Sequence, residues 1–134
     1  MKYNGIIESK LRIIEENTGI IKNWKIRSLR ELQENPMLHL AVERALQIAI
    51  EAMIDVAERI VALNKIPPQD SSASNLKKLH ELNIIRNATD YSEMIRFRNF
   101  IVQRYEKIDL EIIFNIITNK LDLFIQFVDE IRKA

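Results

Sequence analysis

The sequence contains no cysteine and few of the residues that interrupt helices or bind metals. Its 134 residues include two glycines, three prolines and two histidines. Without cysteine, disulfides, thiolate zinc sites and cysteine nucleophiles are excluded. Gly5 and Gly19 are too few for a glycine-rich phosphate loop, and His39 and His80 are too few for most histidine-rich metal sites. The inventory of catalytic residues is therefore small.

The charge of the chain is nearly balanced, and the chain has no long apolar run. Twenty Lys and Arg residues face 19 Asp and Glu residues, for a net charge of +1. This balance provides no global field that attracts nucleic acid or an anionic membrane. No stretch approaches about 18 uninterrupted apolar residues, and the N-terminus lacks the pattern of a signal peptide. We therefore expect a cytoplasmic protein without a membrane-spanning segment.

The composition favours helices, since 47% of the residues are apolar and 29% are charged while Gly and Pro are scarce. We expect an all-α fold in which residues 1–134 form a single domain, an up-and-down helical bundle. The predicted helices cover about 3–17 (with an extension to 24), 28–34, 36–64, 76–85, a segment that contains 94–102, and 110–131. Gly19 is expected to stop or kink the first helix, and Ile21 and Trp24 to continue its apolar stripe. Residues 65–75, with two prolines and three serines, are predicted to be a loop, either a connector or a functional flap.

The helix over 36–64 is the clearest of these predictions. Asn35 is a good N-cap and Pro36 suits the first helical position. Most of its remaining residues are apolar, and its acidic and amide side chains form one narrow ridge: Glu43, Gln47, Glu51, Asp55 and Glu58. A helix that is apolar on most sides is expected to lie at the centre of the core or against a second subunit. Asp109 is the predicted N-cap of the last helix.

The segment over 96–109, RFRNFIVQRYEKID, combines arginines with apolar and aromatic residues. An amphipathic helix with solvated or paired arginines explains this pattern without a function. The same segment resembles the signature of the HEPN superfamily, specifically the HepT-like toxins of the HepT–MntA (type VII) toxin–antitoxin class. That signature is Arg-Asn, three residues, His, one residue, Tyr and a closing Asp, and the matching positions are Arg98, Asn99, Gln103, Tyr105 and Asp109. The resemblance covers nearly the whole chain, including the lead-in MIRFRN and the apolar helix LQIAIEAMIDVAERI.

The resemblance implies a metal-independent endoribonuclease without a cofactor. It also implies a homodimer whose paired motifs line a cleft, an RNA substrate, and a neutralising nucleotidyltransferase of the MntA type. In that family the nucleotidyltransferase adds AMP groups to the motif tyrosine, here Tyr105. Metal-free RNA cleavage uses the neighbouring 2′-hydroxyl as nucleophile and needs a proton acceptor with a pKa near neutrality, which histidine provides. Arg98 would bind the scissile phosphate through its planar fork of donors, and Asn99 would orient one of these groups.

Gln103 stands where the family has histidine. An amide does not titrate near neutral pH, and the loss of general acid–base catalysis costs about 10²–10⁴ in rate. Three explanations remain open: a member that binds without cutting, an altered gene that removes toxicity, or proton transfer by another group. His39 and His80 are interpreted as structural residues, although His80 is not excluded from the cleft.

The geometry of an α-helix limits how the motif residues can share one pocket. On a continuous helix Arg98 and Tyr105 share a face, whereas Gln103 points about 140° away from Arg98. A single pocket therefore requires the helix to end near Gln103 or a second subunit to contribute, and we predict both. The leading hypothesis is a ribonuclease toxin impaired at position 103. The alternatives are a non-catalytic module that binds a nucleotidyltransferase or RNA, and a dimeric bundle with no role in RNA chemistry.

Overall fold

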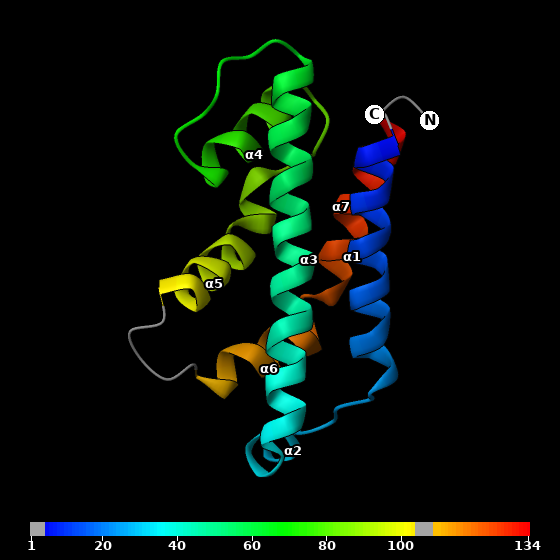
Figure 1. Cartoon of the computed structure of the whole chain (residues 1–134), viewed down its shortest axis with the longest axis vertical. Coiled ribbons are helices and arrows are strands. Elements are labelled where there is room, and N and C mark those ends of the chain that lie inside the picture. Colours follow the sequence, from blue (N-terminus) through cyan, green and yellow to red (C-terminus); the bar gives the residue numbers. More distant parts are fainter. Residues whose placement is uncertain (1–4, 104–108) are drawn as a thin grey trace.

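The computed structural model describes residues 5–103 and 109–134, and every regular element in these ranges is a helix (Figure 1). The elements are α1 (Gly5–Asn23), α2 (Leu29–Glu34), α3 (Pro36–Leu63), α4 (Ser72–Glu81), the 3-10 helix η1 (Ala88–Tyr91), α5 (Ser92–Gln103), α6 (Leu110–Asn119) and α7 (Leu121–Lys133). This confirms the predicted all-α bundle. Among the helices of the described ranges, none has the combined length and apolarity that crossing a bilayer requires.

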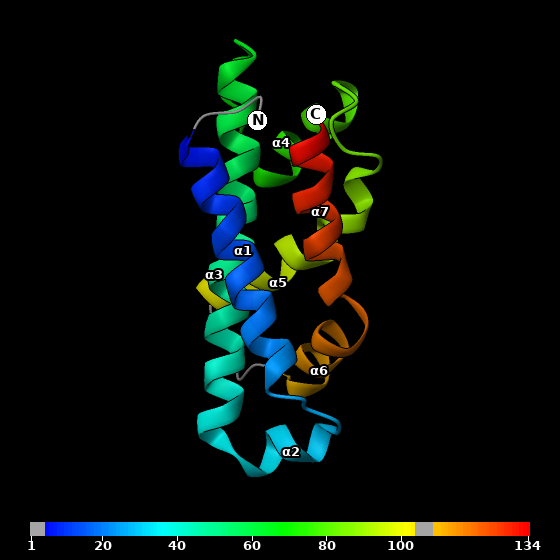
Figure 2. The ribbon, with the colours of Figure 1, turned by 90° about the vertical axis from the view of Figure 1, so that its right-hand side faces the viewer.

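Helix α3 is the spine of the bundle, as predicted. Asn35 caps it, since the side-chain oxygen accepts a hydrogen bond from the backbone N–H of Leu38 at 3.1 Å, and Pro36 occupies the first turn. Figure 1 shows α1 along one side of α3 and α4 and α5 on the other. Figure 2 shows α7 and α6 on the side of the molecule that α1 also covers. The apolar side chains of α3 therefore contact neighbours on several sides. Even Glu43, on the predicted polar ridge of α3, is buried.

Helix α1 runs through Gly19 to Asn23, so the predicted stop or kink at this glycine is wrong. One glycine costs a helix interior only about 1 kcal/mol, and the buried Ile14, Thr18 and Ile21 hold the helix on both sides of it. The helix ends where Lys25 adopts a positive φ of 51°. Trp24 lies just beyond the last turn and is 39% exposed, so it does not continue the buried stripe.

Two further boundaries differ from the predicted ones. The last helix divides at Lys120 into α6 and α7, although neither Gly nor Pro marks the break in the sequence. Asp109 caps α6 as predicted, accepting a hydrogen bond from the N–H of Glu111 at 2.9 Å. Helix α4 begins inside the predicted loop, at Ser72, because the hydroxyl of Ser71 accepts a hydrogen bond from the N–H of Ser74 and so acts as an N-cap.

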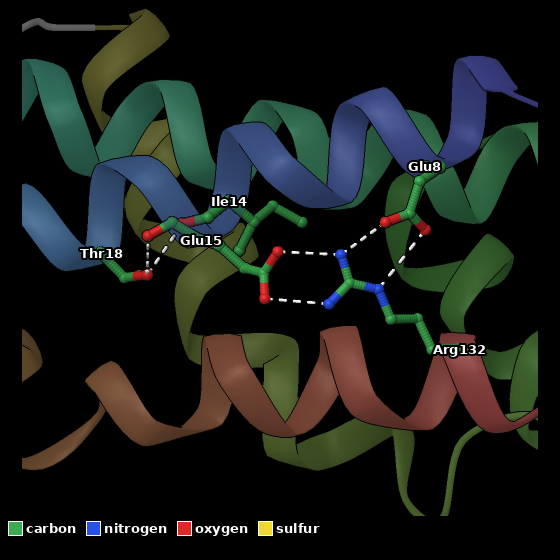
Figure 3. A network of polar contacts seen from close by, with 5 residues as sticks. All are labelled: Glu8, Ile14, Glu15, Thr18 and Arg132. Carbon is green, nitrogen blue, oxygen red and sulfur yellow. Dashed lines mark hydrogen bonds and ion pairs between the residues drawn. The ribbon is translucent and has the colours of Figure 1, made fainter.

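Arg132 joins the first helix to the last (Figure 3). Its Nη2 lies 2.6 Å from Glu8 Oε1 and 2.8 Å from Glu15 Oε1, and its Nη1 lies 2.9 Å from Glu15 Oε2. The hydrogen bonds to both carboxylates raise the pKa of Arg132, and the bond from Arg132 lowers the pKa of Glu8. We call these three residues the Arg132 cluster. The cluster ties α1 to α7, and these two helices lie side by side in Figure 2.

Candidate functional site

The start of α5 is anchored to α7 through Tyr91. This tyrosine is fully buried, donates its hydroxyl proton to the carboxylate of Glu130 and accepts a hydrogen bond from Gln126 at 3.1 Å. Its ring meets Phe127 edge to face, with the ring centroids 5.2 Å apart. Burial and the bond to Glu130 raise the pKa of Tyr91 above its ordinary range. The base of α5, the helix that carries Arg98, Asn99 and Gln103, is therefore firmly placed.

Arg98 projects from α5 and is only partly exposed. Its Nη2 donates a hydrogen bond to the hydroxyl of Ser72, at the start of α4, over 3.2 Å. Its Nε is buried and has no hydrogen-bond partner among the described residues. No carboxylate in the described ranges forms an ion pair with it. A buried donor without a partner costs about 1–3 kcal/mol, so Arg98 is held in a position that leaves part of its donor capacity unused.

Arg98 also lines a hollow of about 420 Å³ between α1, α3 and α5. Besides Arg98, the lining consists of Lys10, Ile13, Ile48, Glu51, Ala52, Ile54 and Asp55. The Nζ of Lys10 lies 2.9 Å from a carboxylate oxygen of Asp55, so these two charges are paired. The lining is thus mixed in charge and partly apolar. Its capacity to bind an anion resides in the guanidinium of Arg98, not in a general positive field.

The other predicted site residues follow Arg98 along the chain. Asn99 is exposed on α5, one residue and therefore about 100° further around the helix. Gln103 is the last residue of α5, and nothing about its side chain is described. Tyr105 lies outside the described residues, since residues 104–108 are not among them. The predicted convergence of Arg98, Asn99, Gln103 and Tyr105 in one pocket therefore stays a prediction.

The two histidines do not line the hollow. His80 is exposed on α4, with Nδ1 3.4 Å from the carbonyl oxygen of Ile85, and His39 lies in the first turns of α3. Within residues 5–103 and 109–134 no group of three or more His, Asp or Glu side chains is arranged to hold a metal ion.

Sequence reasoning missed Ser72 and the acidic and basic residues around the hollow. The sequence predicts a loop at Ser72, and its contact with Arg98 joins positions 26 residues apart. Lys10 and Asp55 belong to helices that were predicted, but their spacing in the sequence does not show that they meet. A signal lies in the three serines at 71, 72 and 74, because serine is a preferred helix N-cap.

Comparisons with known proteins agree with this architecture. The ribonuclease HepT-like family model matches residues 7–131. The chain is similar to the mRNA nuclease HepT of Shewanella oneidensis, with 29% identity over 103 residues, 75% of this chain and 73% of that protein. It is also similar to the structure of a tri-AMPylated HEPN toxin of Shewanella oneidensis in complex with MNT antitoxin, with a TM-score of 0.89, 26% identity and coverage of 98% of this chain and 100% of the other.

A further structure, a MntA–HepT toxin–antitoxin complex with a tyrosine-to-alanine substitution, is similar with a TM-score of 0.85 and 26% identity, covering 98% of this chain and 100% of the other. The helical fold agrees with the family match, which covers nearly the full length of the chain. The chain belongs to the ribonuclease HepT-like family.

Proposed function

We propose that this chain is the toxin of a toxin–antitoxin pair, with the architecture of a metal-independent endoribonuclease that Gln103 impairs. The observation that carries the proposal is the guanidinium of Arg98, which is partly exposed at a hollow and is held by the neutral hydroxyl of Ser72. An RNA phosphate offers acceptor oxygens to the donors of a guanidinium that has no carboxylate partner in the described ranges. The mRNA nuclease name of the Shewanella oneidensis relative supports RNA as the substrate.

The proposed division of labour follows from the chemistry of each side chain. Arg98 binds the scissile phosphate and stabilises the charge that develops on it when the 2′-hydroxyl attacks. Asn99, exposed next to it on α5, orients the substrate or its neighbour by hydrogen bonding. Gln103 occupies the position of the acid–base and can donate or accept a hydrogen bond, but it does not transfer a proton near pH 7. Substrate binding is therefore retained while cleavage is slow.

We further propose a cognate nucleotidyltransferase of the MntA type as the antitoxin, and Tyr105 as the residue that it modifies. The modification joins the phenol oxygen of Tyr105 to the α-phosphate of ATP, with loss of pyrophosphate and of the phenol proton. Support comes from the relative whose toxin is tri-AMPylated in complex with an MNT antitoxin, and from the related complex with a tyrosine-to-alanine substitution. Bulky, negatively charged AMP two residues beyond Gln103 would repel an RNA phosphate from the site.

We propose that residues 1–134 act as one domain that pairs with a second copy of itself. Ile6, Ile13 and Ile20 recur at seven-residue steps on one face of α1, and Ile6 and Ile20 are 51% and 45% exposed. Ile13 lines the same hollow as Arg98. A second copy packed along this stripe would cover it and bring two Arg98 side chains toward one cleft. Sedimentation tests this directly, since Ile20→Glu should convert a dimer to a monomer.

The experiment that tests the proposed activity is the substitution Gln103→His. With a chelator present, the variant should cleave labelled RNA about 10²–10⁴ times faster than the parent chain, and its expression should arrest growth. An inert variant that still binds the antitoxin would instead favour the non-catalytic binding module. Loss of both RNA and antitoxin binding from folded protein would favour a bundle with no role in this system.

A further inference from the structure

We infer that Ser72 is a positioning residue for Arg98, so that the start of α4 sets how the site holds an RNA phosphate. The inference rests on the proposed role of Arg98. The contact that carries it is the hydrogen bond from Arg98 Nη2 to Ser72 Oγ, 3.2 Å long, which joins α5 to α4. It is the hydrogen bond that ties the guanidinium to the described part of the protein, because Nε has no partner there.

The chemistry of this partner suits an arginine that must bind an anion. A carboxylate would hold the guanidinium more tightly, but its negative charge would also balance the positive charge that attracts a phosphate. The hydroxyl of Ser72 is a neutral acceptor, so it restrains the guanidinium and leaves the full positive charge available to a phosphate. Because the guanidinium is planar and rigid, fixing Nη2 also restricts the directions of Nε and Nη1. Arg98 therefore loses less conformational entropy when a phosphate binds, because its side chain is already restrained in the free protein.

Ser72 is itself well placed to serve as a fixed point. It is the first residue of α4, and the residues around it are tied by the N-cap of that helix. Ser71 Oγ accepts from the N–H of Ser74 at 3.1 Å and lies 2.9 Å from Ser74 Oγ, which in turn lies 3.4 Å from Asp70 Oδ1. The backbone that carries Ser72 is therefore held by hydrogen bonds in which the Ser72 hydroxyl takes no part.

These contacts also supply a matched control. Ser72 and Ser74 are both partly exposed serines in the first turn of α4, and only Ser72 contacts Arg98. Ser74→Ala removes the hydrogen bonds of its hydroxyl to Ser71 and Asp70 without touching the arginine. Ser72→Ala removes the bond to the arginine and leaves the cap intact. Ser72→Thr retains the hydroxyl and should retain the affinity.

The test measures the affinity of the folded, full-length chain for a fluorescently labelled single-stranded RNA by anisotropy, with Gln103 in place so that the RNA survives. We expect Ser72→Ala to weaken binding about 3- to 10-fold, the effect of one ordinary hydrogen bond. Ser72→Thr and Ser74→Ala should bind like the parent. In an Arg98→Ala background, Ser72→Ala should produce no further loss, because the group that it positions is gone.

Three results would overturn the inference, and they are distinguishable. Equal weakening by Ser74→Ala, or by Ser72→Ala with and without Arg98, would show a general effect on α4. Parental affinity of Ser72→Ala, when Arg98→Ala binds weakly, would remove Ser72 from the site and leave the proposed function standing. Parental affinity of Arg98→Ala would contradict the role proposed for Arg98 and the inference with it.

Discussion

Arg132 and Arg98 are both partly buried, but their hydrogen-bond partners differ in charge. Arg132 donates hydrogen bonds to the carboxylates of Glu8 and Glu15, which lie one above the other on α1 (Figure 3). Arg98 donates to a serine hydroxyl, and its buried Nε remains unpaired among the described residues. The charge of Arg132 is balanced by two carboxylates, whereas no carboxylate in the described ranges balances the charge of Arg98.

This difference separates a structural arginine from a binding one. The Arg132 cluster satisfies its donors and acceptors internally, so its hydrogen bonds contribute to the stability of the contact between α1 and α7. Arg98 has an unpaired buried donor, which detracts from stability, and no carboxylate partner in the described ranges, so its charge is available to an anionic ligand. We therefore expect substitutions at the two positions to separate stability from activity.

The largest expected effect is on catalysis. In the Gln103→His background, Arg98→Ala should slow RNA cleavage about 10²–10³-fold, as expected when a donor to developing negative charge is removed. Arg132→Ala in the same background is the control and should cleave at nearly the parental rate at a temperature where both proteins are folded. Equal losses at the two positions would abolish the distinction between them.

The next effect is on stability and concerns the anchor of α5. Tyr91→Phe should lower the free energy of unfolding by about 1–3 kcal/mol, because Glu130 loses a buried hydrogen-bond donor. Urea unfolding measures this change. Arg98→Ala, measured in parallel, should leave the free energy of unfolding nearly unchanged. A larger loss from Arg98→Ala than from Tyr91→Phe would mean that Arg98 serves the fold.

A smaller loss is expected at the Arg132 cluster. Arg132→Ala should lower the free energy of unfolding by about 1–2 kcal/mol, since the ion pairs are partly exposed and screened by solvent. Lys133→Ala removes the neighbouring exposed cation on α7 and should change the stability little. If both variants unfold at the parental urea concentration, the cluster contributes nothing measurable.

The smallest effect is the pH dependence that Glu8 confers. Arg132 lowers the pKa of this carboxyl below its ordinary value of 4.5, so the unfolded chain takes up the proton first as the pH falls. The stabilisation is therefore present above that value and is lost as the pH drops through the folded pKa. We expect a contribution of about 0.5 kcal/mol at this partly exposed site. The difference in stability between the parent and Glu8→Gln should shrink on acidification, and a difference that grows would contradict the assignment.

The sequence was sufficient for those features that depend on local pattern. The apolar periodicity of α3 with Asn35 and Pro36 at its start predicted the central helix, and the resemblance to a family signature identified Arg98 and Asn99 as candidate site residues. The break at Lys120 was missed because no Gly or Pro marks it. The bond from Arg98 to Ser72 was missed because it arises when two helices pack, and no spacing along the chain encodes that contact.

The most direct test of the contrast between Arg98 and Arg132 is the NMR signal of each arginine Nε–Hε group during titration with RNA. Substitution of each arginine by lysine assigns its signal. We expect RNA to shift the Arg98 signal, because a phosphate bound by the partly exposed guanidinium changes the surroundings of Nε, and to leave the Arg132 signal in place. An Arg98 signal that stays unchanged while RNA binds elsewhere on the chain would contradict the assignment of this arginine as the phosphate-binding residue.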